Sequence, residues 1–416
     1  MRRPGLAAGS QPAGMQHALR ADLSGELLLH GYALRGLQLD LYWQAQRRLG
    51  VNYNFNVRLL DAAGLLWNRV EIVRPADWRF IPGTDFWPPE KYIVDSQILQ
   101  PLAGLPPGEY QLQVVAFRSD TLAELGAVAL GKFVQSAPAR AHAVSAAPLA
   151  KFADARLELR ALEFSRNAAA PGEPVRVDLV WRAAGLLPEQ LGVRLALIGP
   201  GAQRAAEWRV PLGALYPAAR WQPNNLVRDA HAITLPAELA AGEYQWEIAI
   251  DPALPAVAQN YRTAQLFTVL KLERQFAAPA MQTRLQAQLD GRVLLAGFTV
   301  QPGAQSAAAP LDVRLVWQCV AALPQHYRVF VHLLNAQGQL VAQSDAEPAG
   351  WTRPTTGWLP GEFVVDAHQL QLPAALAAGS YTLQAGLYDA ASGQRLSGSS
   401  NPAGVVLLQV VQVAAP

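Results

Sequence analysis

Two Asp-x-His pairs are the residues of this sequence whose types and spacing best suit chemistry. Asp229 precedes His231 and Asp366 precedes His368, whereas the related Asp95 is followed two residues later by glutamine. Residues two apart on a strand project from one face, so each pair could provide two ligands to a metal ion. Two ligands are too few for a closed metal site, so we expect none. The aspartates are instead expected to accept backbone hydrogen bonds after a tight turn.

Tryptophans in predicted loops form a second group with chemical potential. Three of them precede a proline, and two others lie elsewhere between predicted strands. An indole near the surface can stack on a sugar ring, whereas an indole packed against proline can close the end of a β-sandwich, and the sequence leaves both readings open. The carbohydrate-binding candidates are therefore Trp78, Trp351, Trp358, Trp221 and Trp87.

Other chemistry has little support in the sequence. There is no Gly-x-Ser-x-Gly, Walker loop, His-Glu-x-x-His or dinucleotide fingerprint, so we expect no cofactor. The 34 basic residues almost balance the 32 acidic ones, which argues against a nucleic-acid partner. The single cysteine, Cys319, permits no internal disulfide and is expected to be a buried apolar residue. A glycosidase remains an alternative because its two carboxylates leave no sequence motif.

The chemical candidates belong to a pattern that recurs three times along the 416 residues. The pattern is Trp-x-Pro-x5-Asp-x12-Gly-x-Tyr, and upstream of each copy a strand-like run ends in another tryptophan. A spacing kept in three copies indicates a structural role within one repeated fold. The structural repeat residues are Trp43, Trp181 and Trp317, then Asp95, Asp229 and Asp366, and finally Tyr110, Tyr244 and Tyr381.

The elements that must position these residues are strands. Apolar residues alternate at period two in each repeat, for example from Tyr381 to Leu387, and tight turns such as Asp61–Gly64 and Asn335–Gly338 separate the runs. A tyrosine early in a late strand is typical of the tyrosine corner. We therefore predict an all-β protein of three tandem immunoglobulin-like or fibronectin-III-like antiparallel β-sandwiches, joined as an elongated string.

Composition shifts predict the boundaries of the three units. Residues rich in Ala and Pro without alternation are read as linkers, and the N-terminus as a lead-in without structure. The predicted organisation is 1–21 disordered lead-in, 22–136 first sandwich, 137–153 linker, 154–272 second sandwich, 273–283 linker and 284–416 third sandwich.

The third unit carries a family resemblance in QHYRVFVHLLNAQGQLVAQSDAEPAG, residues 325–350, and in TTGWLPGEF, residues 355–363. The second unit matches in WQPNNLVRDAHAITLPAELAAGEYQWEIAI, residues 221–250. These repeats resemble the extracytoplasmic C-terminal β-sandwich modules of bacterial polytopic membrane glycosyltransferases of the dolichyl-phosphate-mannose mannosyltransferase type. The resemblance implies a non-catalytic region at the extracytoplasmic face of a bacterial membrane, and it transfers no catalytic residue.

Three functions therefore compete. The first is a non-catalytic structural or interaction region whose partner is a cell-envelope glycosyltransferase. The second is carbohydrate binding, with a cell-envelope glycan as partner and the loop tryptophans as contacts. The third is a glycosidase-type enzyme. No apolar run is long enough to span a bilayer, and the N-terminus lacks the apolar stretch of a signal peptide.

Overall fold

The computed structural model describes residues 3–7, 14–70, 83–140, 147–188, 190–252, 260–300, 310–373, 376–398 and 401–413. Within these residues the chain is almost entirely β, and its helical segments are only three or four residues long. They are η1 Thr84–Phe86, η2 Pro200–Ala202, η3 Ala218–Arg220, α1 Pro348–Trp351 and η4 Thr355–Gly357. The strands form six sheets, and their pairing is antiparallel except between β12 and β19. The fold is therefore all-β and β-sandwich-like.

The first unit consists of a five-stranded sheet, β1-β6-β4-β3-β2, and a three-stranded sheet, β5-β7-β8. Apolar residues alternate along these strands, so one face of each sheet contributes to a shared core that includes Trp43, Phe55 and Leu112. The strands are β1 Arg3–Ala7, β2 His17–Leu23, β3 Leu27–Arg35, β4 Gln38–Ala45, β5 Tyr53–Leu60, β6 Lys91–Ile98, β7 Gly108–Arg118 and β8 Glu124–Gln135.

The second unit pairs the sheet β10-β11-β13-β16-β9 with the sheet β12-β19-β17-β14-β15, to which β18 adds. Trp181 and Trp246 are fully buried in its core. The strands are β9 Ala139–Arg140, β10 Ala150–Phe152, β11 Leu157–Phe164, β12 Ala168–Ala169, β13 Pro174–Ala183, β14 Gly192–Ile198, β15 Arg204–Pro211, β16 Asn225–Thr234, β17 Gly242–Asp251, β18 Tyr261–Arg262 and β19 Phe267–Val269.

The third unit pairs the sheet β20-β21-β22-β25 with the sheet β24-β23-β26-β27. Its core contains Trp317, Trp358 and the single cysteine, Cys319, whose thiol has a pKa raised by burial to about 11. The strands are β20 Thr283–Leu289, β21 Val293–Val300, β22 Leu311–Cys319, β23 Tyr327–Leu334, β24 Leu340–Ala346, β25 Phe363–Leu370, β26 Gly379–Asp389 and β27 Val406–Val413.

Hairpin and corner residues explain how the repeats fold locally. Asn335 Oδ1 accepts the amides of Gln337 and Gln339, and Gly338 adopts a φ of 75°, so this turn forms as predicted. The three repeat tyrosines each donate their hydroxyl to a carbonyl four residues earlier, at 2.8–2.9 Å. This bond is the one that a tyrosine corner predicts. The pairs are Tyr110 with Pro106, Tyr244 with Ala240, and Tyr381 with Ala377.

Two segments predicted to lack structure contain strands. Strand β2 begins at His17, inside the predicted lead-in, and pairs with β3, while β1 pairs with β6. The predicted linker 137–153 contributes β9 and β10 to opposite edges of one sheet in the second unit. The two- and three-residue strands β9 and β10 need little alternation because backbone pairing holds them, and for that reason composition did not reveal them.

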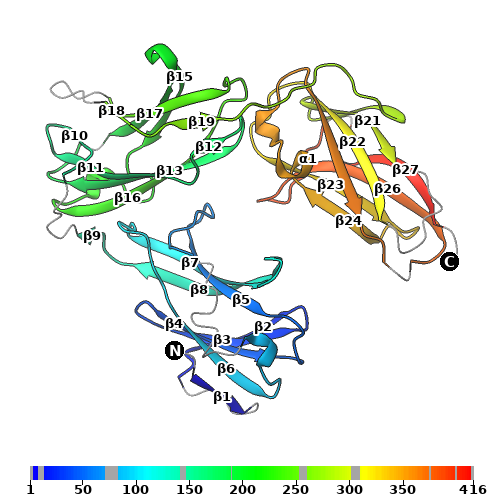
Figure 1. Ribbon diagram of the computed structural model, residues 1–416, viewed down its shortest axis with the longest axis horizontal. Helices are drawn as coiled ribbons and strands as arrows, with labels where there is room; N and C mark the ends of the chain where they lie inside the picture. Colours follow the sequence, from blue (N-terminus) through cyan, green and yellow to red (C-terminus); the bar gives the residue numbers. More distant parts are fainter. Residues whose placement is uncertain are drawn as a thin grey trace.

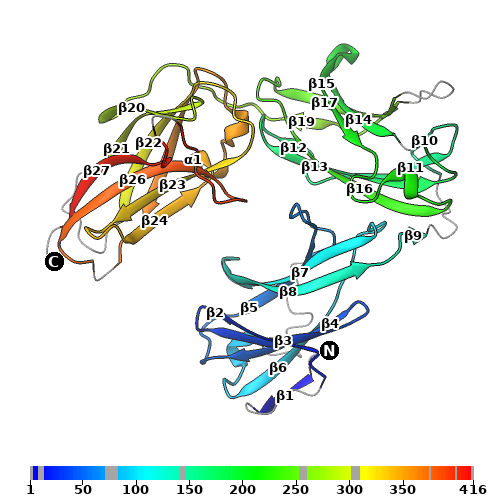
Figure 2. The ribbon, with the colours of Figure 1, turned by 180° about the vertical axis from the view of Figure 1, so that it is seen from behind.

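The three units do not lie on one line. The second unit lies beside both others, with the first below it and the third to its side in Figure 1, and Figure 2 shows the same bend from behind. The predicted elongated string is therefore wrong about shape, because contacts at each junction, described below, hold neighbouring units side by side.

Candidate functional site

The three repeat tryptophans that precede proline are buried. Trp87, Trp221 and Trp358 each expose at most 3% of their surface. Each follows a short 3-10 turn that directs the ring into the core, and Trp221 and Trp358 donate their indole N–H to carbonyls five residues earlier. These rings close the sandwich and cannot stack on a sugar. Their assignment as carbohydrate contacts is wrong because the turn and the proline orient them inward.

The repeat aspartates of the second and third units accept backbone hydrogen bonds, but from a different segment than predicted. Asp229 accepts the amides of Gly213 and Ala214 at 3.0 and 3.1 Å, and Asp366 accepts that of Ala349 at 2.8 Å. These donors lie in the loop before the repeat tryptophan, not in the turn after it. Each aspartate therefore fixes a loop that is about 15 residues away in sequence and adjacent only after folding.

Asp366 is the centre of a buried polar chain that the sequence did not reveal. His368 Nε2 lies 2.9 Å from Asp366 Oδ2, and His368 Nδ1 lies 3.0 Å from Ser344 Oγ. A carboxylate accepts only, so Nε2 donates to Asp366, and in the neutral imidazole Nδ1 then accepts the Ser344 hydroxyl. Ser344 is on β24 and His368 on β25, so the chain ties an edge of one sheet to the other.

A Ser-His-Asp chain is also the arrangement that activates a serine nucleophile, so acyl transfer is the chemistry it could support. Here Asp366 and His368 are buried, and Asp366 also accepts Trp317 Nε1 at 3.4 Å. In the second unit His231 Nε2 lies 3.0 Å from Asp229 Oδ2 but at an angle that makes no hydrogen bond. The same pair thus occurs in a second unit without any serine contact, which favours a structural role.

The repeat itself supplies a test of that role. In the first unit the residue corresponding to His368 is Gln97, whose Nε2 donates to Asp95 at 2.8 Å. We expect His368→Gln to keep the donor and to change the free energy of unfolding by less than about 1 kcal/mol, whereas His368→Leu leaves Asp366 short of a donor and should cost about 1–3 kcal/mol. Urea denaturation of the full chain measures both. Equal losses would contradict the structural role.

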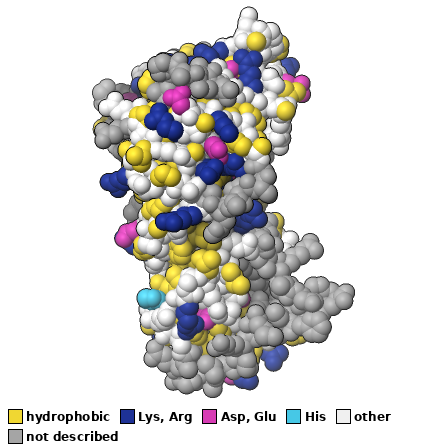
Figure 3. Space-filling model, turned by 90° about the vertical axis from the view of Figure 1, so that its left-hand side faces the viewer, with side chains coloured by type: hydrophobic (Ala, Val, Ile, Leu, Met, Phe, Trp, Pro, Cys, Tyr) yellow, Lys and Arg dark blue, Asp and Glu magenta, His cyan; other side chains and the backbone are white. Residues whose placement is uncertain are grey.

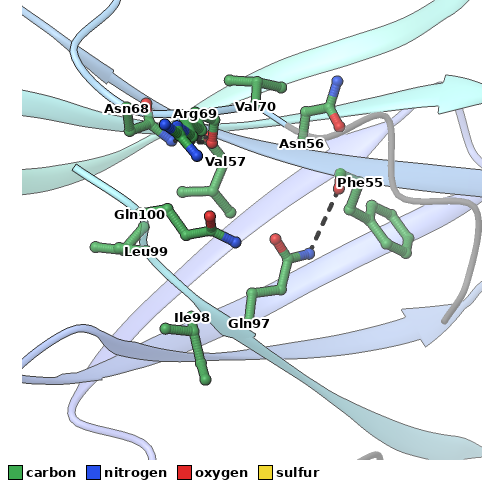
Figure 4. Close-up of a pocket in the computed structure, with 10 residues that line it drawn as sticks. All are labelled: Phe55, Asn56, Val57, Asn68, Arg69, Val70, Gln97, Ile98, Leu99 and Gln100. Carbon is green, nitrogen blue, oxygen red and sulfur yellow. Dashed lines mark hydrogen bonds between the residues drawn. The ribbon is translucent and has the colours of Figure 1, made fainter. Parts of the chain in front are cut away.

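A polar cavity of about 50 Å³ lies in the first unit, between β5 and β6. Figure 4 shows Gln97 and Gln100 directed into it, with Gln97 Nε2 donating to the Phe55 carbonyl at 3.5 Å. Asn56 and Asn68 also line it, and Arg69 is the charged side chain among the described residues that surround it. This volume holds a few water molecules. The described residues that line it include no acid–base pair.

The two tryptophan candidates outside the repeat have different outcomes. Trp78 lies outside the described residues. Trp351 exposes 53% of its surface, at the end of α1, and the Arg328 guanidinium lies 4.9 Å from its ring centre. Trp67, also outside the repeat, is buried beneath Arg176 of the second unit. Among the carbohydrate-binding candidates that the structure describes, Trp351 is therefore the one whose ring is accessible to a ligand.

Charged side chains do not gather into one large patch on the face shown in Figure 3, where basic and acidic residues are interspersed. The described residues include no group of three or more His, Cys, Asp and Glu side chains placed to hold a metal ion. Nor does any helix in the described parts of the chain have the length and apolarity to cross a membrane.

Comparisons with known proteins add little. No protein-family model and no curated protein matches this chain. Among solved structures, it is similar to a DUF4785 family protein from Legionella pneumophila, with 12% identity over 97% of this chain and 93% of that one, at a TM-score of 0.20. A TM-score this low bears on neither fold nor function.

Proposed function

We propose that this chain is a non-catalytic array of three immunoglobulin-like or fibronectin-III-like sandwiches that holds its units at fixed angles for interaction with a partner. The observation that carries the proposal is the pair of junctions, where the backbones of neighbouring units are in close contact and arginine side chains of one unit bond carbonyls of the next. Such contacts fix the relative orientation of the units, so the array is proposed to be rigid and not flexibly linked.

At the first junction, Arg228 of β16 reaches into a loop of the first unit. Its side chain exposes 4% of its surface, and its Nε donates to the Ala103 carbonyl at 3.0 Å. The same guanidinium bonds Asp178 and Glu163 of its own unit, and its backbone amide donates to the Gly104 carbonyl. Because these partners neutralise it, the buried charge can cross the junction.

Two further features bring the first and second units together. The Gly104 backbone lies very close to the backbone of β16: a Cβ on Gly104 would be 2.8 Å from the backbone nitrogen of Arg228. Arg176 stacks 5.1 Å from the centre of the Trp67 ring and donates to the Leu66 carbonyl. A close backbone approach combined with cation–π stacking defines one relative position for the two units.

The second junction has the same design. A Cβ on Gly357 would lie 2.3 Å from the Pro171 carbonyl oxygen, so only glycine allows this contact between the third and second units. Thr356 Oγ1 donates to the Gly172 carbonyl at 2.6 Å. Arg274, between the units, donates to the carbonyls of Ala237 in one and Gly357 in the other.

The location and partner in this proposal rest on the sequence resemblance. By that resemblance the array stands at the extracytoplasmic face of a bacterial membrane, beside a polytopic glycosyltransferase. The structure supports the role: the repeat tryptophans are buried in the cores, and the repeat tyrosines bond within their own units. A repeated sandwich whose shared residues serve its own packing suits a scaffold.

The rigid array predicts a specific response to Gly357→Ala. The added methyl meets the Pro171 carbonyl and should separate the second and third units without entering either core. Small-angle X-ray scattering of the full chain should fit one bent shape, and the variant should show a larger maximum dimension. Gly50→Ala is the matched control, since a Cβ there has nothing within 4 Å. Wild-type scattering that requires a broad ensemble would overturn the proposal.

The first junction should also loosen in acid. Hydrogen bonding to Arg228 lowers the pKa of Glu163 below the ordinary value of a glutamate. Stabilisation from a lowered carboxyl pKa is complete above the ordinary value and is lost as the pH falls through the folded value. We expect scattering at pH 3 to show a more extended particle than at pH 7. Glu163→Gln removes the titrating group and should respond less, and an equal response would exclude Glu163 as the cause.

Enzyme activity is the alternative that the Ser344 chain makes testable. The proposal expects no turnover of p-nitrophenyl esters by the full chain. Ester hydrolysis that is abolished by Ser344→Ala would contradict the scaffold proposal and show that the protein is a hydrolase.

Carbohydrate binding is a second candidate function, favoured by one observation, the exposed indole of Trp351.

A further inference from the structure

The outer face of the sheet β24-β23-β26-β27 carries aromatic rings and guanidinium groups side by side. Arg328, Phe330 and His332 alternate along β23 with core residues, so their side chains project together away from the core. Tyr388 lies opposite Arg328 on β26, and Asp345 lies opposite Phe330 on β24. This set, with Trp351 and Arg395 from adjoining loops, is called the outer aromatic face below.

Two arginines on the outer aromatic face lack a carboxylate partner among the described residues. Arg328 is held over Trp351 at 4.9 Å, and Arg395 is held over Phe330 at 4.8 Å. Neither guanidinium makes an ion pair or side-chain hydrogen bond with any residue that the structure describes. Gly386 makes room for this, because a Cβ there would lie 2.5 Å from the Phe330 ring. The result is two oriented cations that favour an anion.

The backbone conformation that exposes Trp351 is energetically unfavourable. It has a φ of 70°, and Ala349 and Gly350 before it are also left-handed, a conformation that is unfavourable for a residue with a side chain. Asp366 holds this turn by accepting the Ala349 amide at 2.8 Å. An exposed indole on a strained turn contributes little to the core, and its ring is accessible to a ligand.

Polar groups complete the outer aromatic face. His332 Nε2 lies 3.5 Å from Asp345 Oδ1. Burial lowers the pKa of His332, and the nearby Arg395 lowers it further, against the opposing effect of Asp345. A neutral imidazole has both a donor and an acceptor, and a carboxylate accepts hydrogen bonds. His332 and Asp345 can therefore form hydrogen bonds with the hydroxyl groups of a ligand. Aromatic, cationic and hydroxyl-binding groups are thus present on one surface.

We propose that the outer aromatic face binds an acidic saccharide chain. One sugar ring would stack on Trp351, the uronate carboxylates would bind Arg328 and Arg395, and sugar hydroxyls would meet His332 and Asp345. This inference rests on the carbohydrate-binding candidate and specifies its ligand as anionic. It is independent of the fixed angles between units.

Affinity electrophoresis of the full chain in gels containing polygalacturonate tests the proposal. We expect retardation that falls at least tenfold in the double variant Arg328→Gln, Arg395→Gln. The matched control is Arg284→Gln, Arg314→Gln, which removes two exposed arginines from the opposite sheet with the same change of charge and should keep retardation. Trp351→Gly should abolish retardation and still fold, because glycine adopts this φ without strain.

Parallel gels containing neutral dextran separate the outcomes. Loss of retardation to an equal extent in both double variants would mean attraction by net charge and would overturn the site. Retardation by dextran that depends on Trp351 but not on the two arginines would overturn the acidic ligand and leave the carbohydrate candidate standing. Retardation by neither polymer would refute both.

Discussion

Trp317→Ala is expected to lower the free energy of unfolding of the third unit by about 3–5 kcal/mol. The indole is fully buried between the two sheets, and its removal leaves a cavity that the surrounding strands can only partly fill. The substitution also removes the Nε1 donor from Asp366, which is itself buried. Loss of packing and loss of a buried hydrogen bond therefore act in the same direction.

Hydrogen exchange of the full chain measures this effect where it arises. Protection of β21 and β22 should fall in Trp317→Ala, while strands of the first unit keep theirs, because each unit has its own core. Trp351→Ala is the matched control, since it removes the same side chain from an exposed position in the same unit. Similar losses of protection in both variants would contradict the assignment of Trp317 to the core.

Glu362→Ala is the second large effect, with an expected loss of about 3–5 kcal/mol. The Glu362 side chain has no exposed surface, and its two oxygens bond different arginines. Oε2 accepts Arg274 at 2.6 Å, and Oε1 accepts Arg353. Removing the carboxylate leaves two guanidinium groups that are mostly buried without a counter-ion, so the penalty is that of uncompensated charge.

Urea denaturation and scattering together check the Glu362 prediction. Because Arg274 also bonds carbonyls of both neighbouring units, the variant should lose stability in the third unit and become more extended. Glu273→Ala is the control: that carboxylate is 87% exposed and pairs with an exposed lysine, so its removal should leave the urea midpoint and the scattering unchanged. A negligible effect of Glu362→Ala would show that the second junction does not depend on this carboxylate.

Local patterns predicted much of the fold because their causes lie within a few residues. Alternation at period two placed Trp317 and Trp181 inside, and both are buried. The Gly-x-Tyr spacing predicted the corner bonds of Tyr110 and its counterparts because donor and acceptor are four residues apart. The same logic failed for the short edge strand β9, which is defined by its partner and not by its own residues.

The candidate sites were less predictable, because their members come from separate strands. Sequence spacing brought Asp366 and His368 together, but Ser344 joins them only because β24 and β25 meet at the sheet edge. Trp351 and Trp358 were both carbohydrate candidates, and a 3-10 turn buries Trp358 while a left-handed turn exposes Trp351. Arg328 reaches Trp351 through the register of β23, which no local pattern encodes.

By itself, then, the sequence determined an all-β chain, a threefold repeat and the tryptophans and tyrosines that build its cores, since periodicity and turn chemistry act over short distances. Tertiary structure decided the bend between units, the burial of Arg228 and Glu362 at the junctions, and the grouping of Arg328, Arg395 and Trp351 on one face. These features depend on which surfaces meet, and contacts between distant residues are specified by packing of the whole chain.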